Sequence, residues 1–175
     1  MSSRNEQGFT LIELLIVVAI ISVIASMAIP GLLKARMTGN ETSAIASLRQ
    51  TATAQTSYST TCGNGSYAAS YQVLGTPPPG NVEAFLSADL AKAAPVQKHG
   101  YNFDLTASAG SGAGPADCNG TATISAWLAT AIPQTFASSG SRSFAVNTSM
   151  TVWQSASPTP PAEPFTASAT VTPVQ

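Results

Sequence analysis

The run from Phe9 to Leu33 contains one charged side chain, that of Glu13, and it limits the possible folds more than any other feature. As a helix it would extend roughly 37 Å, enough to cross the apolar core of a bilayer. Residues 14–29 are apolar on all sides, and a chain of 175 residues is too small to enclose such a rod. The run is also too long for a secretory signal peptide and lacks an Ala-x-Ala end. The sequence therefore predicts a membrane helix.

Glu13 is the unusual residue of this run. A carboxylate inside a membrane helix costs about 2.5–3.5 kcal/mol, so its presence predicts a partner or a function. A short polar leader, residues 1–8, precedes the run and ends at Gly8. Cleavage after Gly8 would give Phe9 a new α-amine four residues from Glu13. That cation could neutralise the carboxylate in the same chain or in a neighbouring one.

Residues 8–21 read GFTLIELLIVVAII and resemble the N-terminus of type IV prepilins and pseudopilins. The resemblance implies that a prepilin peptidase cuts after Gly8 on the cytoplasmic side and N-methylates Phe9. It also implies that Glu13 pairs with the amine of an adjacent subunit as a filament is built.

The turn around Pro30 matches the same family, in which the proline kinks the helix and the segment can unwind in filaments. Pro30 removes a helix hydrogen bond, and Gly31 weakens the same turn. The leader departs from the family because no Lys or Arg stands next to Gly8, while Lys34 and Arg36 follow the apolar run. Charge counting alone would not place the N-terminus in the cytoplasm. The motif, the expected disulfide and the polar C-terminal composition together place the residues beyond the membrane outside the cytoplasm.

Helical periodicity continues past the apolar run. Residues 44, 45, 48, 52 and 55 recur at helical spacing, and no strong breaker occurs before the glycines that follow Cys62. We therefore expect one helix from Phe9 to about Thr60, roughly 78 Å long. Its parts are a transmembrane and polymerisation segment, 9–33, and an amphipathic continuation, 34–61, that packs on the remaining domain.

The globular part is predicted over residues 62–154. One helix is expected between Asn81 and Pro95, with its inward positions at Val82, Phe85, Leu86 and Leu90. Period-two alternation then predicts strands with inward faces at 101, 103 and 105, at 122, 124, 126 and 128, and in a hairpin around 147–149. Residues 109–120 are expected to form a flexible glycine-rich connector.

These strands predict a three- or four-stranded antiparallel sheet with one apolar face, and the long helix would cover that face. The fold class is therefore α+β, the pilin fold in the terms of the resemblance. Residues 155–175 form a tail rich in Pro, Ser and Thr, in which 165–171 could add an edge strand.

Cys62 and Cys118 form neither a CxxC nor a Cys/His ligand pattern. A disulfide formed outside the cytoplasm is favoured over two unrelated thiols, because small exported domains commonly use such bonds. Closing a loop of this size would stabilise the fold by about 4 kcal/mol.

No catalytic, cofactor or metal site is predicted, and the chain is interpreted as a protein without enzymatic activity. The single histidine, His99, lies in an expected turn, and Asp89, Asp104 and Asp117 are isolated carboxylates. No calcium loop is recognisable. Secretion pseudopilins, which the N-terminus also resembles, often carry one near the C-terminus, so the resemblance favours a pilus subunit. The net charge of −1 and pI near 5.7 give no basic surface for nucleic acid.

The sequence thus predicts a structural subunit of a type IV pilus or a related surface filament. A pseudopilin of a type II secretion system, or a low-copy minor pilin that binds a surface or DNA, remains the alternative. The expected partners are copies of itself, the prepilin peptidase, the inner-membrane assembly platform with its ATPase, and the membrane before assembly. N-x-Ser/Thr triplets allow glycosylation at Asn40, Asn64, Asn119 and Asn147.

Overall fold

The computed structural model describes residues 9–174. Its contacts divide the chain into two units, Met1–Arg36 and Met37–Gln175, which are described separately. The helix α1, Leu11–Thr61, contributes its apolar part to the first unit and its polar part to the second. The expected bounds, Phe9 to about Thr60, agree with α1 to within two residues.

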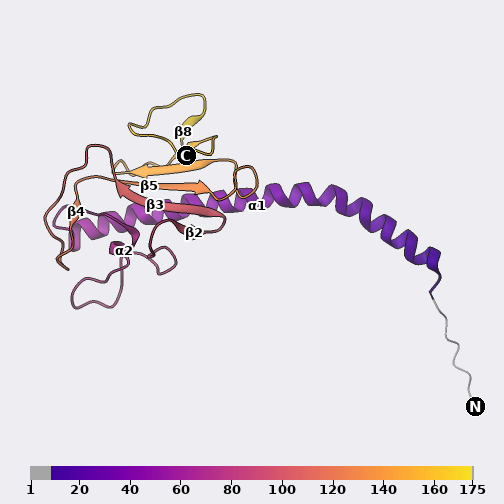
Figure 1. Ribbon diagram of the computed structural model, residues 1–175, viewed down its shortest axis with the longest axis horizontal. Helices are drawn as coiled ribbons and strands as arrows, with labels where there is room; N and C mark the ends of the chain where they lie inside the picture. Colours follow the sequence, from indigo (N-terminus) through magenta and orange to yellow (C-terminus); the bar gives the residue numbers. More distant parts are fainter. Residues whose placement is uncertain (1–8, 175) are drawn as a thin grey trace, which may run out of the picture. The chain divides into compact units, whose positions relative to one another are not determined.

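Two antiparallel sheets and a short helix complete the second unit (Figure 1). The smaller sheet pairs β1, Tyr67–Ala68, with β4, Thr123–Ile124, and α2 spans Tyr71–Leu74. The larger sheet has the order β2-β3-β5-β6-β7-β8. Its strands are Val96–Lys98, Tyr101–Ala107, Trp127–Pro133, Ser143–Asn147, Trp153–Ser155 and Val171–Pro173.

The α+β class and the antiparallel sheet are confirmed, but the predicted number of strands in the main sheet is wrong. Six strands are present. β7 is the second arm of the predicted hairpin and β8 corresponds to the optional edge strand, whereas β2, only three residues long, carries little periodic signal and was not predicted. The edge strand expected at 165–171 lies instead at Val171–Pro173, where it pairs with β7.

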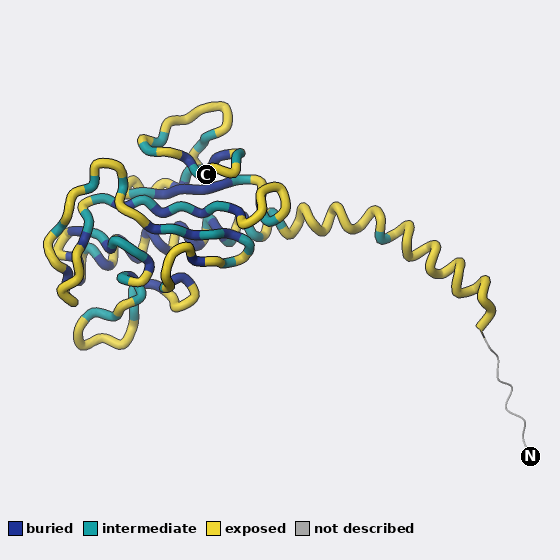
Figure 2. The backbone as a smooth tube through the Cα atoms, in the orientation of Figure 1, coloured by how far each residue is buried: buried dark blue, intermediate teal, exposed yellow. Residues whose placement is uncertain are grey.

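The core lies between the polar part of α1 and one face of the larger sheet. Ala44, Leu48 and Tyr58 of α1 belong to the same buried cluster as Phe103 of β3 and Phe144 of β6. In Figure 2 this buried zone follows the strands and the helical segment behind them. The prediction that α1 covers the apolar face of the sheet is therefore confirmed.

The buried stripe of α1 is unusually polar. Gln55 is fully buried, and its amide donates to the carbonyl of Ala68 at 2.9 Å while its oxygen accepts the Ala68 amide at 2.9 Å. The hydroxyl of Thr51 donates to the Ser47 carbonyl. Because each of these groups has a partner, burial does not leave polar atoms unsatisfied.

Glu41 is a buried carboxylate at the start of this stripe. It accepts hydrogen bonds from the amide and hydroxyl of Ser141, both at 2.8 Å, and from the guanidinium of Arg142. Arg142 in turn donates to Gln154 and lies 5.6 Å from the centre of the Phe144 ring. Burial alone would raise the pKa of Glu41, but Arg142 and Ser141 outweigh it, so the pKa lies below its ordinary value.

We predict that Glu41→Gln weakens folding and flattens its acid dependence. The pKa of Glu41 is lower in the folded state than in the unfolded state. The stability contributed by its ionised carboxylate is therefore complete above the unfolded pKa, near 4.3, and is lost as the pH falls through the folded pKa. At pH 7 the loss of a charge-assisted hydrogen bond should cost about 2 kcal/mol. Urea titrations at pH 7 and pH 3 measure both effects, with Glu83→Gln, an exposed loop site, as the control. An equal loss of stability at both pH values would contradict this role.

The helix predicted between Asn81 and Pro95 is wrong. The segment consists of turns, and Val82, expected to face inward, is 94% exposed. Leu86 and Leu90 are buried as predicted, but not by a helix: the Leu86 amide donates to the Leu74 carbonyl of α2, and the Leu90 amide donates to the Ser87 carbonyl within a turn. The apolar spacing that suggested a helix therefore comes from two leucines of a loop, each of which packs into the core separately.

The inward face predicted for residues 122–128 is also wrong. Trp127 is fully buried and Leu128 only half-buried, so the inward residues of β5 are Trp127, Ala129 and Ala131. Thr123 of β4 is buried as well, so the odd-numbered residues face inward on both sides of the bend at residues 125–126, and the predicted alternation was one residue out of phase. The alanines lie opposite Leu105 and Phe103 of β3, whose larger side chains fill the space.

Candidate assembly site

The N-terminal end of α1 forms a local cap. The carboxylate of Glu13 accepts hydrogen bonds from the amide and the hydroxyl of Thr10, at 2.9 and 2.7 Å. The Glu13 amide donates to the Thr10 hydroxyl oxygen at 3.3 Å. This reciprocal arrangement is a capping box, in which two side chains satisfy amides that the helix leaves without partners.

Thr10 is a functional candidate that the sequence analysis missed. The Thr-x-x-Glu pattern was visible at residues 10–13, directly before an apolar run, and it is the sequence signature of a capping box. The unusual carboxylate therefore has a structural task within its own helix besides any task between chains.

The cap uses only part of the Glu13 carboxylate. Both bonds from Thr10 go to Oε2, and within the described residues Oε1 has no hydrogen-bond partner. Phe9, at the start of the described chain, is 91% exposed. Gly8 lies outside the described residues, so the junction predicted to be cut has no structural description. The arrangement leaves one carboxylate oxygen available to a cation while the helix end stays capped.

The apolar part of α1 is uncovered in the single chain. It is the one helix among residues 9–174 that is long and apolar enough to cross a membrane, and none of its most apolar stretch is buried (Figure 2). Large side chains point outward all around it. Such a surface is unstable in water and requires lipid or other apolar helices. It is a candidate interaction surface of the described chain.

The helix continues through Pro30 and Gly31. Pro30 cannot donate a backbone hydrogen bond to the carbonyl of Ser26, so this turn is held by fewer bonds than its neighbours. A Cβ atom at Gly31 would meet no other atom within 4 Å, so packing does not require glycine there. The kink and the unwinding expected at these residues stay predictions.

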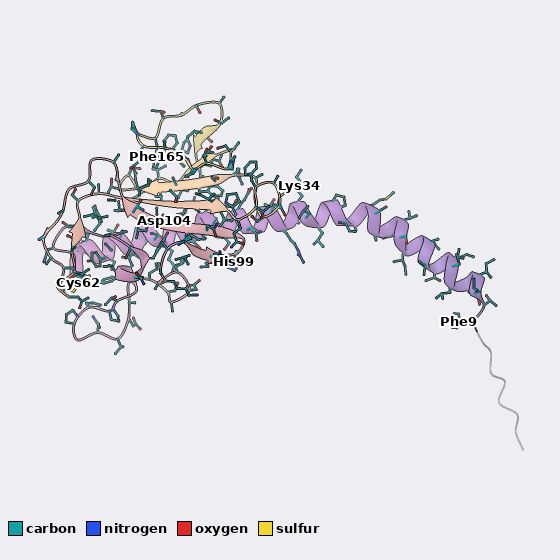
Figure 3. All side chains as sticks on the ribbon, in the orientation of Figure 1. Phe9, Lys34, Cys62, His99, Asp104 and Phe165 are labelled. Carbon is teal, nitrogen blue, oxygen red and sulfur yellow. A yellow bond between two sulfur atoms is a disulfide. The ribbon has the colours of Figure 1, made fainter. Side chains whose placement is uncertain are left out.

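A disulfide joins Cys62, directly after α1, to Cys118, with their Cα atoms 4.8 Å apart. Figure 3 shows Cys62 at the end of the helix. The Cys118 amide also donates to the Cys62 carbonyl at 2.9 Å, and the Tyr58 hydroxyl donates to Asp117 at 2.7 Å. The paired cysteines are those predicted from the sequence.

The glycine-rich segment 109–120 is held by many bonds, in contrast to the flexible connector that was expected. Burial alone would raise the pKa of Asp117, but Tyr58 and the Thr121 and Asn119 amides outweigh it, so the pKa is lowered. A Cβ atom at Gly114 would lie 2.3 Å from the side-chain oxygens of Ser66 and Thr123. Gly114 therefore permits a close approach between this segment and the smaller sheet.

The other polar candidates are dispersed. His99 is exposed in a turn, where its Nδ1 lies 2.7 Å from the Ser43 hydroxyl, and Asp89 pairs with Lys98 at 2.6 Å. Among residues 9–174 no group of three or more His, Cys, Asp or Glu side chains could hold a metal ion. The side-chain amides of all four N-x-Ser/Thr asparagines donate to protein oxygens, in Ser139, Ala116, Pro77 and Glu163.

Comparison with known proteins gives a family match that includes the residues of this site. Residues 3–29 match the family described as the prokaryotic N-terminal methylation motif. The type IV wide pilus major component PilA4 of Thermus thermophilus is 45% identical to the chain over 71 residues. The match covers 41% of this chain and 53% of that relative, so the chain spans about half the length of the curated relative it matches. No solved structure matches the chain.

Proposed function

We propose that the chain is a structural subunit of a type IV pilus or a closely related surface filament, and its N-terminal motif and its similarity to a major pilus component support this proposal. The subunits would assemble by packing their N-terminal helices together. The observation that carries this proposal is the apolar part of α1, of whose most apolar stretch nothing is buried in the single chain.

The lone carboxylate of that surface supports a specific contact. Among the described residues Glu13 keeps Oε1 unpaired while Thr10 occupies Oε2. We propose that the amine of Phe9 in an adjacent subunit binds this oxygen, so that two charges are neutralised together. The capping box then positions the carboxylate without competing for the incoming cation.

The remaining parts follow from the same proposal. Residues 1–8 are a leader removed by a prepilin peptidase, and 9–33 form the polymerisation helix that lies in the inner membrane before assembly. Residues 34–61 continue that helix, 62–154 form the globular part outside the cytoplasm, and 155–175 form the tail. An inner-membrane assembly platform and its ATPase would extract the subunit, with no catalytic role for the chain itself.

Two other assignments use the same N-terminal helix. A pseudopilin would stay in the periplasm, and a minor pilin would occur in few copies with an adhesive or DNA-binding role. The relative's description as a major component supports the pilus subunit. Imaging and mass spectrometry of sheared surface fibres separate the three, since only a major subunit should dominate the fibre mass.

We predict that the mature chain begins at Phe9. Intact-mass analysis of purified filaments should give a chain that lacks residues 1–8 and carries one additional methyl group on the Phe9 amine. Gly8→Val should block cleavage, because a bulky side chain then stands at the cut bond, while Ser3→Val, elsewhere in the leader, serves as the control. A mature subunit that retains residues 1–8 would contradict the prediction.

A further inference from the structure

The C-terminal tail and the β6–β7 hairpin enclose a surface groove of 340 Å³ that the assembly proposal does not use. The floor of the groove contains two half-buried aromatic rings, Trp153 of β7 and Phe165 of the tail. Their centres are 5.7 Å apart and their planes differ by 35°. Figure 3 shows Phe165 on the tail segment above the sheet. The other lining residues are Asn147, Ser149, Thr151 and Pro164.

The groove is held in shape by Glu163, next to the lining residue Pro164. One Glu163 oxygen accepts the Asn147 side-chain amide at 2.6 Å. The other accepts the Ser108 hydroxyl at 2.6 Å and the Ala109 amide at 3.2 Å. The tail is thereby fastened to two loops, and this carboxylate is already occupied. The lining residues themselves carry no charge.

Polar groups of the lining are left without strong protein partners. Within residues 9–174 the Ser149 hydroxyl makes no hydrogen bond to protein, since only the backbone amide and carbonyl of this residue are bonded. The Thr151 hydroxyl has only a long contact of 3.5 Å with the Ser149 carbonyl. An aromatic floor with neutral donors at its margin is typical of a small-ligand site in which polar groups fix orientation.

We propose that this groove binds a neutral pyranose sugar. The C–H face of such a ring is apolar and packs on an aromatic side chain, while its hydroxyls accept from and donate to neutral polar groups. Trp153 and Phe165 supply the first surface, and Ser149 and Thr151 supply the second. No lining side chain could neutralise a charged ligand, so acidic and basic ligands are disfavoured. The site lies in the second unit and does not depend on filament assembly.

The test uses the full-length protein in a zwitterionic detergent without a sugar headgroup. Methyl glycosides of glucose, galactose, mannose and N-acetylglucosamine serve as probes in saturation-transfer NMR. At least one should bind saturably, with half-saturation at about 1–10 mM, as expected for a small ring on an open surface. The chain has only two tryptophans, and Trp127 is fully buried, so a change in emission on binding reports Trp153.

Variants test the individual contacts. Trp153→Ala should abolish binding, whereas Trp153→Phe should retain it more weakly and lose the fluorescence change. Ser149→Ala removes a hydroxyl that makes no protein bond, so the fold should persist while affinity falls about 2- to 10-fold. Thr148→Ala, in the same turn but outside the lining, is the matched control and should bind as the wild type does.

Three results would overturn the proposal. One is the absence of saturation by every sugar up to about 100 mM, ten times the weakest affinity expected for a ring of this size. Another is undiminished binding by Trp153→Ala. The third is self-association through the groove in place of sugar binding, seen as a monomer–dimer equilibrium that Trp153→Ala abolishes while no sugar binds.

Discussion

Glu13→Val should lower the yield of sheared filaments at least about tenfold while leaving normal amounts of subunit in the membrane. The substitution would leave the amine of a neighbouring Phe9 without a partner in apolar surroundings. Breaking such a pair by removing one member costs about 3–5 kcal/mol, and about 1.4 kcal/mol already corresponds to a factor of ten. The ratio of filament yield to membrane-fraction abundance measures the effect.

The capping box requires a control, because Glu13→Val also removes the bonds to Thr10. Glutamine is accepted at this position of a capping box, so Glu13→Gln keeps the cap and removes only the charge. Thr10→Ala does the reverse, at a cost to the helix end of about 1 kcal/mol. We expect Glu13→Gln to fail in assembly as Glu13→Val does, and Thr10→Ala to assemble. Filaments of normal yield from Glu13→Gln would show that the charge is dispensable.

Replacing both Cys62 and Cys118 by alanine should lower the free energy of unfolding by about 4 kcal/mol, the largest stability effect expected for this chain. The disulfide closes a loop with a sequence separation of 56 residues, and its loss allows the unfolded chain far more conformations. Denaturant titration of the detergent-solubilised protein measures the difference. Thr61→Ala, at an exposed neighbouring site, serves as the control.

Peptide mapping without reductant gives an independent check on this bond. Peptides containing Cys62 and Cys118 should be recovered joined from native filaments. Recovery of both as alkylatable thiols would contradict the pairing, and a double variant as stable as the wild type would contradict its energetic role.

The sequence predicted the long helix well because the relevant signals are local. The apolar run, the helical spacing after residue 40 and the breakers after Cys62 require no knowledge of other segments. The buried stripe was harder to identify, because Glu41 and Gln55 are polar and become suitable core residues only through partners remote in sequence. A hydropathy pattern does not depend on such partners, so it could not predict the polar part of the core.

The errors in the globular part share a physical cause. At residues 81–94 the spacing of Leu86 and Leu90 resembled a helix, although each leucine enters the core from a separate turn. At residues 122–128 the predicted inward face was one residue out of phase, because Thr123 and Trp127 are buried where Ala122 and Leu128 were expected. Short strands and bends are set by tertiary contacts, and intrinsic preferences are too weak to reveal them.

At the assembly site, the motif led to Gly8, Phe9 and Glu13 but not to the partner role of Thr10. The Cys62–Cys118 pair was predictable because the chain has only two cysteines. The sugar groove was not, because Trp153 and Phe165 are brought together by a tail that sequence periodicity describes only as polar.

The buried part of α1 is fastened at both ends, by Glu41 to Ser141 and Arg142 and by Cys62 to Cys118. These anchors are about 32 Å apart along the helix axis. A force along the helix axis would load both anchors and the contacts between them in shear at the same time. Peeling the helix from one end would require breaking a covalent bond or a charged cluster first. Resistance to force depends on the rate of unfolding, and we expect this geometry to lower that rate under axial tension.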